Sequence, residues 1–187
     1  EKVRPYDQKK VFSLSDGSVS ALLETVDSAK ARGAETLCRV TGYGMAHGSV
    51  PFGKVTGSAA GLTAAVEAAL DDAHLTASDI DAIVGFANGH SALDAVEAEG
   101  LSKCFDLSRV PVISVKERAG EGRAASATLG LAHAALMLHG DLAEEPDAYL
   151  AAADGMKKVG VKSADLSRIL VVSFAAGGSY TAIVAER

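Results

Sequence analysis

Four side chains that could take part in chemistry stand just beyond short apolar segments. Asn88 and His90 follow one such segment, and Lys116 and Glu121 follow another. An amide donates and accepts hydrogen bonds, an ammonium group donates them, and an ionised carboxylate only accepts them. An imidazole can do either and can exchange protons near neutral pH. These residue types make the two regions the first candidates for a site.

Each of these residues also has a purely structural interpretation. Asn88 directly precedes a glycine, a pair that is typical of turns at the end of a strand. Lys116 without a partner would be an ordinary solvated lysine. Glu121 could form an ion pair with Arg118 or Arg123. The spacing of these residues in the sequence fits a structural role and a functional site equally well.

The thiol and remaining imidazole side chains do not form a recognisable ligand set. Cys38 and Cys104 lie far apart in the sequence, and neither stands in a CxxC or Cys/His pattern that could hold zinc. We expect both to be small packing residues, and His47 and His139 to be surface or packing residues. No metal and no cofactor are expected.

Composition limits the class of protein and the kinds of partner. The 187 residues are 48% hydrophobic and 22% charged, which is compatible with one domain over residues 1–187 that buries a substantial core. The formal net charge is −6 and no Lys/Arg cluster occurs, so nucleic acid is not an expected partner. No apolar run approaches the roughly 18 residues of a membrane helix. Reduced cysteines and the lack of a secretory signal predict a protein of the cytoplasm.

Apolar patterns predict the elements that position these residues. We expect strands over 18–24, 37–40, 81–87, 110–115, 169–174 and 180–185, and helices over 25–32, 59–74 and 125–138, with a further helix after residue 90. Ser91 would cap that further helix and Asp94 would return the hydrogen bond. The segment 44–58 is expected to be a loop that exposes Met45 and His47.

The order of these elements indicates the fold class. The helix over 125–138 is almost wholly apolar or small, so it should be buried on most sides. The segment 141–163 changes from acidic to lysine-rich and is predicted to be a surface excursion with one helix. The last two strands flank 175–179 and should form a hairpin. Strands and helices alternate up to this hairpin, which predicts an α/β fold with a mixed sheet and helices on both faces.

Six pieces of the sequence carry a resemblance to a known family. They are Arg4-Pro-Tyr-Asp7, Ser15-Asp-Gly17, Leu23-Glu24, Ala29-Lys-Ala-Arg-Gly-Ala34, Gly42-Tyr-Gly44 and Ser173-Phe-Ala-Ala-Gly-Gly178. In this order and spacing they resemble the C-terminal half of the β-ketoacyl-carrier-protein synthases, the condensing enzymes of fatty acid and polyketide synthesis. The resemblance implies a thiolase-like half-fold that ends in a β-hairpin.

The resemblance also implies catalytic positions, most of which are replaced here. The family has a Cys nucleophile in its first half, ahead of the matching region, and two His side chains that stabilise an oxyanion during decarboxylation. Asn88 stands where the family's A-H-G motif has the first His, and Glu121 stands at the second His. Lys116 is kept, and the family's D-x-x-E pair is kept as Asp94 and Glu97.

The two replacements differ in what they could still do. The amide of Asn88 can donate a hydrogen bond to an oxyanion. An ionised Glu121 would repel both malonate and the developing enolate, and only its protonated form could donate. His90 leaves an alternative open, because a loop two residues shorter than the family's could let it occupy the place of the missing imidazole.

The family's S-F-G-F-G-G segment acts as an acyl-pocket and gating loop, and it corresponds here to Phe174, Ala176, Gly177 and Gly178. Ala176 replaces the second Phe, which in the family gates access between the acyl pocket and the catalytic residues. The loss of this gate fits an inactive site. Gly177 and Gly178 also fit a plain hairpin turn, since no helix follows that could bind a phosphate.

The sequence therefore predicts a non-catalytic ketosynthase-like subunit, similar to the chain-length-factor subunits of type II polyketide synthases. Its expected partners are a chain that supplies the N-terminal half, or a ketosynthase, in a hetero-oligomer, and an acyl carrier protein met through that complex. One alternative is the C-terminal half of an active split condensing enzyme whose Cys nucleophile lies on a partner chain. Another is an interaction domain without acyl chemistry.

Overall fold

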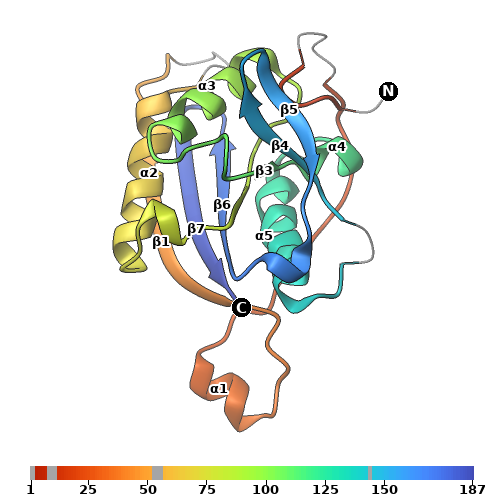
Figure 1. The fold of residues 1–187 in the computed structure, drawn as a ribbon. Coiled ribbons are helices and arrows are strands. Elements are labelled where there is room, and N and C mark those ends of the chain that lie inside the picture. Colours follow the sequence, from red (N-terminus) through yellow and green to blue (C-terminus); the bar gives the residue numbers. More distant parts are fainter. Residues whose placement is uncertain (1–2, 8–11, 52–56, 143–144) are drawn as a thin grey trace.

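The computed structural model describes residues 3–7, 12–51, 57–142 and 145–187, and these residues form a seven-stranded mixed sheet with helices packed on it (Figure 1). The strands are β1 (Arg39–His47), β2 (Ala82–Val84), β3 (Val112–Ile113), β4 (Asp147–Ala152), β5 (Gly155–Gly160), β6 (Arg168–Ala175) and β7 (Ser179–Glu186). The helices are α1 (Val26–Ala31), α2 (Ala59–Asp72), α3 (Ser91–Ser102), α4 (Lys116–Ala119) and α5 (Ala124–His139), with short 3-10 turns η1 (Ala77–Asp79) and η2 (Ser163–Asp165).

The two faces of the sheet carry separate apolar clusters. The strand order is β1-β7-β6-β2-β3-β4-β5, and β2 runs parallel to both β6 and β3 while the other neighbours are antiparallel. Side chains alternate along β6, so Leu170 joins the cluster under α2 and α3, whereas Ile169 and Val171 join the cluster under α5. The predicted mixed sheet with helices on both faces is confirmed.

The close approach of β1 to α2 depends on two glycines. A Cβ atom on Gly44 would lie 2.1 Å from the carbonyl oxygen of Ala65, and one on Gly42 would lie 2.3 Å from that of Ala69. Neither position can carry a side chain while the helix stays in place. The Gly-Tyr-Gly sequence is therefore a packing motif. β1 is longer than the predicted strand over 37–40 and includes Met45 and His47 of the predicted loop. Both side chains are exposed as expected, and residues 52–56 of that loop lie outside the described residues.

The segment 18–38 projects from the body as an arm, and the strand predicted over 18–24 is wrong. Residues 18–24 belong to no strand, and α1 buries none of its residues. Leu22 and Leu23 are 76% and 72% exposed. Figure 1 shows α1 hanging below the sheet, well away from the other helices. A sequence with strand propensity forms a strand only if another strand pairs with it, and no described strand lies beside this segment.

A second correction concerns the segment 141–163. Its predicted helix is absent from the part that the structure describes, where β4 and β5 form an antiparallel hairpin that extends the sheet at one edge. Glu117 ties the hairpin to α4, because it accepts hydrogen bonds from Tyr149 Oη at 2.5 Å and from Lys158 Nζ at 2.7 Å. Lys158, one of the lysines that indicate a free surface, is thus used in contacts between elements, whereas Lys157 and Lys162 are exposed as predicted.

Two helix predictions need adjustment. α3 begins at Ser91 as expected, but its N-cap residue is His90, and no side chain caps it. The carboxylate of Asp94 instead accepts hydrogen bonds from the backbone N–H groups of Tyr6 and Asn88. α5 matches its predicted range, but its first turns are not buried: Ala124 and Ala127 are exposed, because the sheet covers only one side of the helix among the described residues.

The predicted C-terminal hairpin of β6 and β7 is confirmed. None of the helices in the described part of the chain is both long and apolar enough to cross a membrane.

Candidate functional site

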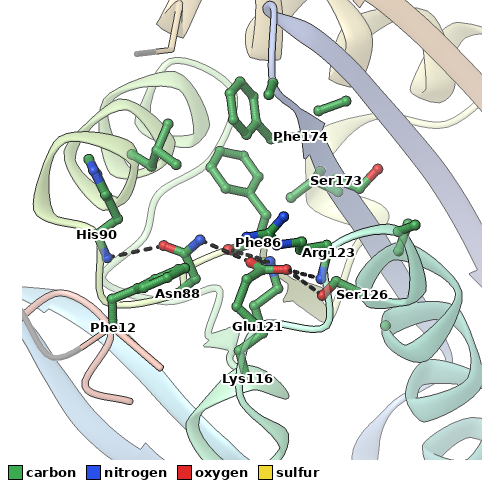
Figure 2. A pocket seen from close by; sticks show the side chains of 18 of the residues that line it. Phe12, Phe86, Asn88, His90, Lys116, Glu121, Arg123, Ser126, Ser173 and Phe174 are labelled. Atoms are coloured by element: carbon green, nitrogen blue, oxygen red, sulfur yellow. Dashed lines mark hydrogen bonds and ion pairs between the residues drawn. The ribbon is translucent and has the colours of Figure 1, made fainter. Parts of the chain in front are cut away.

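A cavity of about 520 Å³ opens at one edge of the sheet. Its wall is mostly apolar and comes from five parts of the chain: Phe12 and Leu14 near the N-terminus, Gly85, Phe86, Asn88, His90 and Leu93 after β2, Lys116, Glu121 and Arg123 on and after α4, Ala124, Ser126, Ala127 and Gly130 on α5, and Val172 to Ala176 at the end of β6. Its size is in the range of pockets that hold small organic ligands. Figure 2 shows these side chains around the open space.

Sheet topology explains why residues so distant in sequence meet here. β6, β2 and β3 are parallel neighbours, so their carboxyl ends reach the same edge of the sheet. The chain that leaves β2 supplies Phe86 and Asn88, the chain that leaves β3 supplies Lys116, and the end of β6 supplies Phe174. Crevices at the carboxyl ends of parallel strands are the usual ligand sites of such sheets.

The polar part of the cavity is a compact cluster of three residues that the sequence had singled out. Lys116 Nζ lies 2.9 Å from Glu121 Oε2, and the amide nitrogen of Asn88 donates to the same oxygen at 2.9 Å. Lys116 also donates to the carbonyl oxygen of Phe86 at 2.9 Å. The three side chains belong to residues that are only 7–8% exposed. The solvated lysine considered above is excluded.

Glu121 is held at both of its carboxylate oxygens. Oε1 accepts hydrogen bonds from the backbone N–H of Arg123 at 2.7 Å and from Ser126 Oγ at 2.6 Å. Burial by itself would raise the pKa of Glu121, but attraction to Lys116 and the hydrogen bonds outweigh it and lower the pKa. The carboxylate is therefore ionised at neutral pH, and the protonated donor form is not the resting state.

The ion pairs expected for Glu121 are wrong. The side chain of Arg118 binds Asp147 at 2.9 Å, on the β4–β5 hairpin. Arg123 contributes its backbone N–H to Glu121. Lys116 is the cation that Glu121 meets, because the short helix α4 and the left-handed turn at Gly120, with φ 77°, bring the two ends of the segment together.

Asn88 shapes the turn after β2 and reaches into the cavity at the same time. Its side-chain oxygen accepts the backbone N–H of His90 at 3.0 Å, and Gly89 adopts a left-handed conformation with φ 82°. The turn interpretation of Asn88 is thus confirmed, together with the donor contact to Glu121. The same residue fixes the loop and aims its own amide at the carboxylate.

His90 lines the cavity but does not reach the charged cluster. Its ring points away from the carboxylate of Glu121 in Figure 2. Nδ1 of His90 is buried and has no hydrogen-bond partner among the described residues. The imidazole is therefore present in the pocket wall, at a different place from the Lys116–Glu121 pair.

A second buried acid, Glu97, supports the cluster from behind. It is fully buried and accepts hydrogen bonds from Tyr6 Oη at 2.7 Å and from the backbone N–H of Phe86 at 2.5 Å. Burial raises its pKa to about 7. The Phe86 peptide is thus clamped between Glu97 and Lys116. The sequence marked Glu97 through the D-x-x-E pattern, but the contact with Tyr6, 91 residues away, could not be read from it.

The gating loop named above lies partly in the cavity wall. Phe174 and Ala176 line it, and the Phe174 ring packs against Phe86 and Tyr180 with ring centroids 5.8 and 5.4 Å apart. Gly177 and Gly178 lie outside the lining, in the β6–β7 turn, with φ of 102° and 90°. The hairpin-turn interpretation of this pair is confirmed. Phe12 and Leu14, which also line the cavity, were missed because no periodic pattern marks their segment.

The described residues contain no group of three or more His, Cys, Asp or Glu side chains that could hold a metal ion. Cys38 and Cys104 are free and half-buried, and burial raises the pKa of both thiols. Neither lies in the cavity wall. The polar side chains of the cavity wall are those of Asn88, His90, Lys116, Glu121, Arg123, Ser126 and Ser173.

Comparison with known proteins identifies relatives over most of the chain. A relative from Streptomyces glaucescens, the tetracenomycin polyketide synthase ketoacyl synthase beta subunit, is 32% identical over 136 residues, which is 72% of this chain and 32% of that protein. The chain spans about a third of the length of the curated relatives that it matches first.

Solved structures share the fold at lower sequence identity. The ishigamide ketosynthase/chain length factor superposes with a TM-score of 0.84 at 22% identity, over 100% of this chain and 47% of that chain. A chain from the structure of a type II polyketide synthase acyl-carrier protein in complex with its ketosynthase superposes with a TM-score of 0.74 at 18% identity. The match covers 87% of this chain and 41% of that chain.

The thiolase-like half-fold inferred from the motifs is thereby confirmed. The family pattern described as "Beta-ketoacyl synthase, C-terminal domain" matches residues 37–145, more than half of the chain, and this range includes the whole Asn88–Lys116–Glu121 cluster. The chain belongs to the β-ketoacyl synthase family, of which it carries the C-terminal domain.

Proposed function

We propose that this chain is a non-catalytic ketosynthase-like subunit, which completes or partners a β-ketoacyl synthase in polyketide or fatty acid biosynthesis and shapes its acyl pocket. The observation that carries the proposal is the buried ion pair of Lys116 and Glu121, with Asn88 bonded to the same carboxylate. Decarboxylation of a malonyl group builds negative charge and needs donors aimed at it. Here Lys116 and Asn88 already donate to an internal carboxylate.

The charge of the cluster opposes decarboxylation of a malonyl group more strongly than a missing imidazole alone would. Lys116 is neutralised by Glu121 at 2.9 Å, so the cavity offers no net positive charge from this pair. A malonyl carboxylate that entered would meet an ionised acid in a poorly hydrated wall, where repulsion is only weakly screened. Asn88 could stabilise an oxyanion only after giving up its bond to Glu121.

The proposed partner is a ketosynthase chain or a chain that supplies the first half of the fold, in a cytoplasmic hetero-oligomer that meets an acyl carrier protein. Support comes from the names of the relatives, one a ketoacyl synthase beta subunit and one a ketosynthase in complex with an acyl-carrier protein. The exposed leucines of the arm and the exposed Tyr43 and Met45 of β1 also favour a covering partner, because apolar groups of this size are costly to leave in water.

His90 favours a second candidate function, the C-terminal half of an active split condensing enzyme with its Cys on the partner chain. The ring lies in the cavity wall, and the buried Nδ1 has no partner among the described residues, so it could bind a ligand that enters. A general acid or oxyanion donor at this position would contribute about 10²–10⁴-fold to the rate. The two candidates thus differ in what the loss of His90 should do.

The test begins with native mass spectrometry of the chain purified from its source, which we expect to report a second bound polypeptide. Condensation by that assembly is then measured with malonyl-carrier protein, for the unchanged chain and for His90→Ala. We expect turnover to change by less than about threefold, because His90 is not in the reacting site. A loss of about 10²-fold or more would favour the active split enzyme. Turnover by the chain without a companion would contradict both candidates.

A further inference from the structure

The carboxylate of Glu121 sits in a site built entirely of hydrogen-bond donors. Oε2 accepts from Lys116 Nζ and from the Asn88 amide, each at 2.9 Å. Oε1 accepts from the Arg123 backbone N–H at 2.7 Å and from Ser126 Oγ at 2.6 Å. Two donors to each oxygen fill the roughly four acceptor sites that an ionised carboxylate offers.

These donors are held in place by contacts that do not involve the carboxylate. Lys116 also binds the Phe86 carbonyl oxygen, and the Asn88 side-chain oxygen is fixed by the His90 backbone N–H. Ser126 lies on α5 and accepts the backbone N–H of Gly122 at 3.0 Å. The three side-chain donors therefore keep contacts of their own if the acid is removed.

We propose that Glu121 is a built-in occupant of a carboxylate-binding site, and that by filling this site it restricts the cavity to uncharged acyl groups. The inference rests on the proposed function in one respect, namely that the cavity holds the acyl group of a biosynthetic intermediate. The proposed function does not say how ligands are selected, whereas here one side chain, Glu121, selects them by charge.

The exclusion of anionic ligands follows from charge and space together. A carboxylate directed at Lys116, Asn88 and Ser126 would find these three donors already bound to Glu121. It would also face that ionised acid in a wall that is mostly apolar and that Arg123 also lines. An uncharged chain meets Phe86, Phe174 and Leu93 instead, and it buries apolar surface without repulsion. The other buried acid nearby, Glu97, does not fill this site, because it binds Tyr6 and the Phe86 N–H behind the wall.

The backbone at Glu121 is anchored independently of its side chain, which makes the acid removable. Its N–H donates to the Ser13 carbonyl oxygen at 2.8 Å, and its carbonyl oxygen accepts from the Ser15 N–H at 3.1 Å. These two bonds pin residue 121 to the N-terminal segment. Glu121→Ala should therefore leave an open space with the side chains of Lys116, Asn88 and Ser126 still directed into it.

The test compares two ligands that differ only at one end, hexanamide and hexanoate, on the full chain without any partner. Calorimetry measures both dissociation constants for the unchanged chain, for Glu121→Ala and for Lys116→Met/Glu121→Ala. We expect the unchanged chain to prefer hexanamide. Glu121→Ala should shift the ratio of the two constants toward hexanoate by about tenfold or more, because the ligand carboxylate takes the vacated place. The double variant, which lacks the cation, should lose that shift.

Two outcomes would overturn the inference: an unchanged ratio in folded Glu121→Ala, or an equal shift in the double variant. If Glu121→Ala fails to fold by circular dichroism, Glu121→Ser is measured with the same ligands, since its hydroxyl also leaves the carboxylate site empty. The measurement needs no companion chain and no turnover. Its failure therefore leaves the proposed subunit role standing, and a failed search for a companion leaves the ligand selection standing.

Discussion

Around Glu121, polar groups that are withdrawn from water find partners inside the chain, whereas along the arm of residues 18–38 apolar side chains remain in water. Both oxygens of Glu121 are fully bonded, and its cation is buried with it. In the arm, Leu22 and Leu23 are more than two-thirds exposed, and α1 buries nothing. Among the described residues, the carboxylate of Glu121 is satisfied within the chain, whereas the leucines of the arm are not covered by it.

The arm is nevertheless organised, which separates it from a disordered tail. Arg32 binds Glu24 through Nε at 2.8 Å, and Thr25 caps α1 by accepting the Ser28 N–H at 3.2 Å. At its base, Glu35 lies 3.1 Å from Nε2 of His139 at the end of α5. A prearranged apolar surface reduces the entropy lost on association, so the arm is suited to binding another protein. The comparison predicts large effects on stability at the centre and effects on association alone at the arm.

The largest expected effect is on the buried ion pair. Lys116→Met leaves Glu121 charged and without its cation in the cavity wall, which should lower the free energy of unfolding by about 3–5 kcal/mol. Urea unfolding of the isolated chain measures it. Lys157→Met, which removes an exposed lysine from β5, serves as the control and should change stability by less than about 0.5 kcal/mol.

A loss of less than about 1 kcal/mol in Lys116→Met would show that the centre is not held together by this pair. The double variant Lys116→Met/Glu121→Leu sharpens the result. It removes both charges, so it should regain part of the lost stability. If the double variant is less stable than the single one, the acid contributes through its bonds to Arg123 and Ser126 more than through its charge.

The next effect concerns the pH dependence of stability, and it depends on Glu97. Its pKa of about 7 lies above the roughly 4.3 of an unfolded glutamate, so the folded state holds a proton that the unfolded state releases. The free energy of unfolding should therefore fall as pH rises from about 4.5 to 7, by about 3 kcal/mol from this residue. Asp94, whose pKa burial also raises, adds a change of the same sign.

Glu97→Gln should remove the Glu97 share of this slope, measured by urea unfolding at pH 5 and pH 8. The matched control is Glu99→Gln, an exposed acid on the same helix, which should leave the slope unchanged. Glu121 has the opposite effect, because its pKa is lowered in the folded state. It stabilises the fold at pH values above its unfolded pKa, and this stability is lost as the pH falls through its folded pKa. An identical slope in Glu97→Gln and the unchanged chain would mean that Glu97 is ionised in the folded protein at neutral pH.

The same contrast explains how much of the fold could be predicted from the sequence. Apolar runs such as 169–174 and 180–185 gave correct strands, because β6 and β7 lie inside the sheet and leave few of their residues exposed. The β4–β5 hairpin was missed although Asp154-Gly155 is a hairpin signal, because the charged residues of 141–163 indicate a surface excursion, whereas β4 itself is mostly apolar. The strand over 18–24 was predicted where none forms, because pattern does not reveal whether a pairing strand is present.

The candidate site shows a similar division. Asn88, Lys116 and Glu121 were named from residue types and the family resemblance, and parallel strands do bring them together. The Lys116–Glu121 contact could not be foreseen, because it depends on the tight turn at Gly120. The Tyr6–Glu97 bond links residues 91 positions apart, and no local pattern encodes such a contact.

The smallest expected effect is at the arm, and it appears only when a partner is present. Leu22→Ser/Leu23→Ser should change the unfolding free energy of the isolated chain by less than about 0.5 kcal/mol, because both side chains are already in water. Binding to the companion chain should weaken by about tenfold or more, since each leucine that becomes buried contributes about 1.5 kcal/mol or more. Ala21→Ser, a small change at an exposed position beside them, is the control for binding. An affinity equal to that of the control would place the interface elsewhere, on β1 or on the open side of α5. A large loss of stability in the isolated chain would instead mean that the arm packs on its own body, which would remove the contrast between centre and periphery.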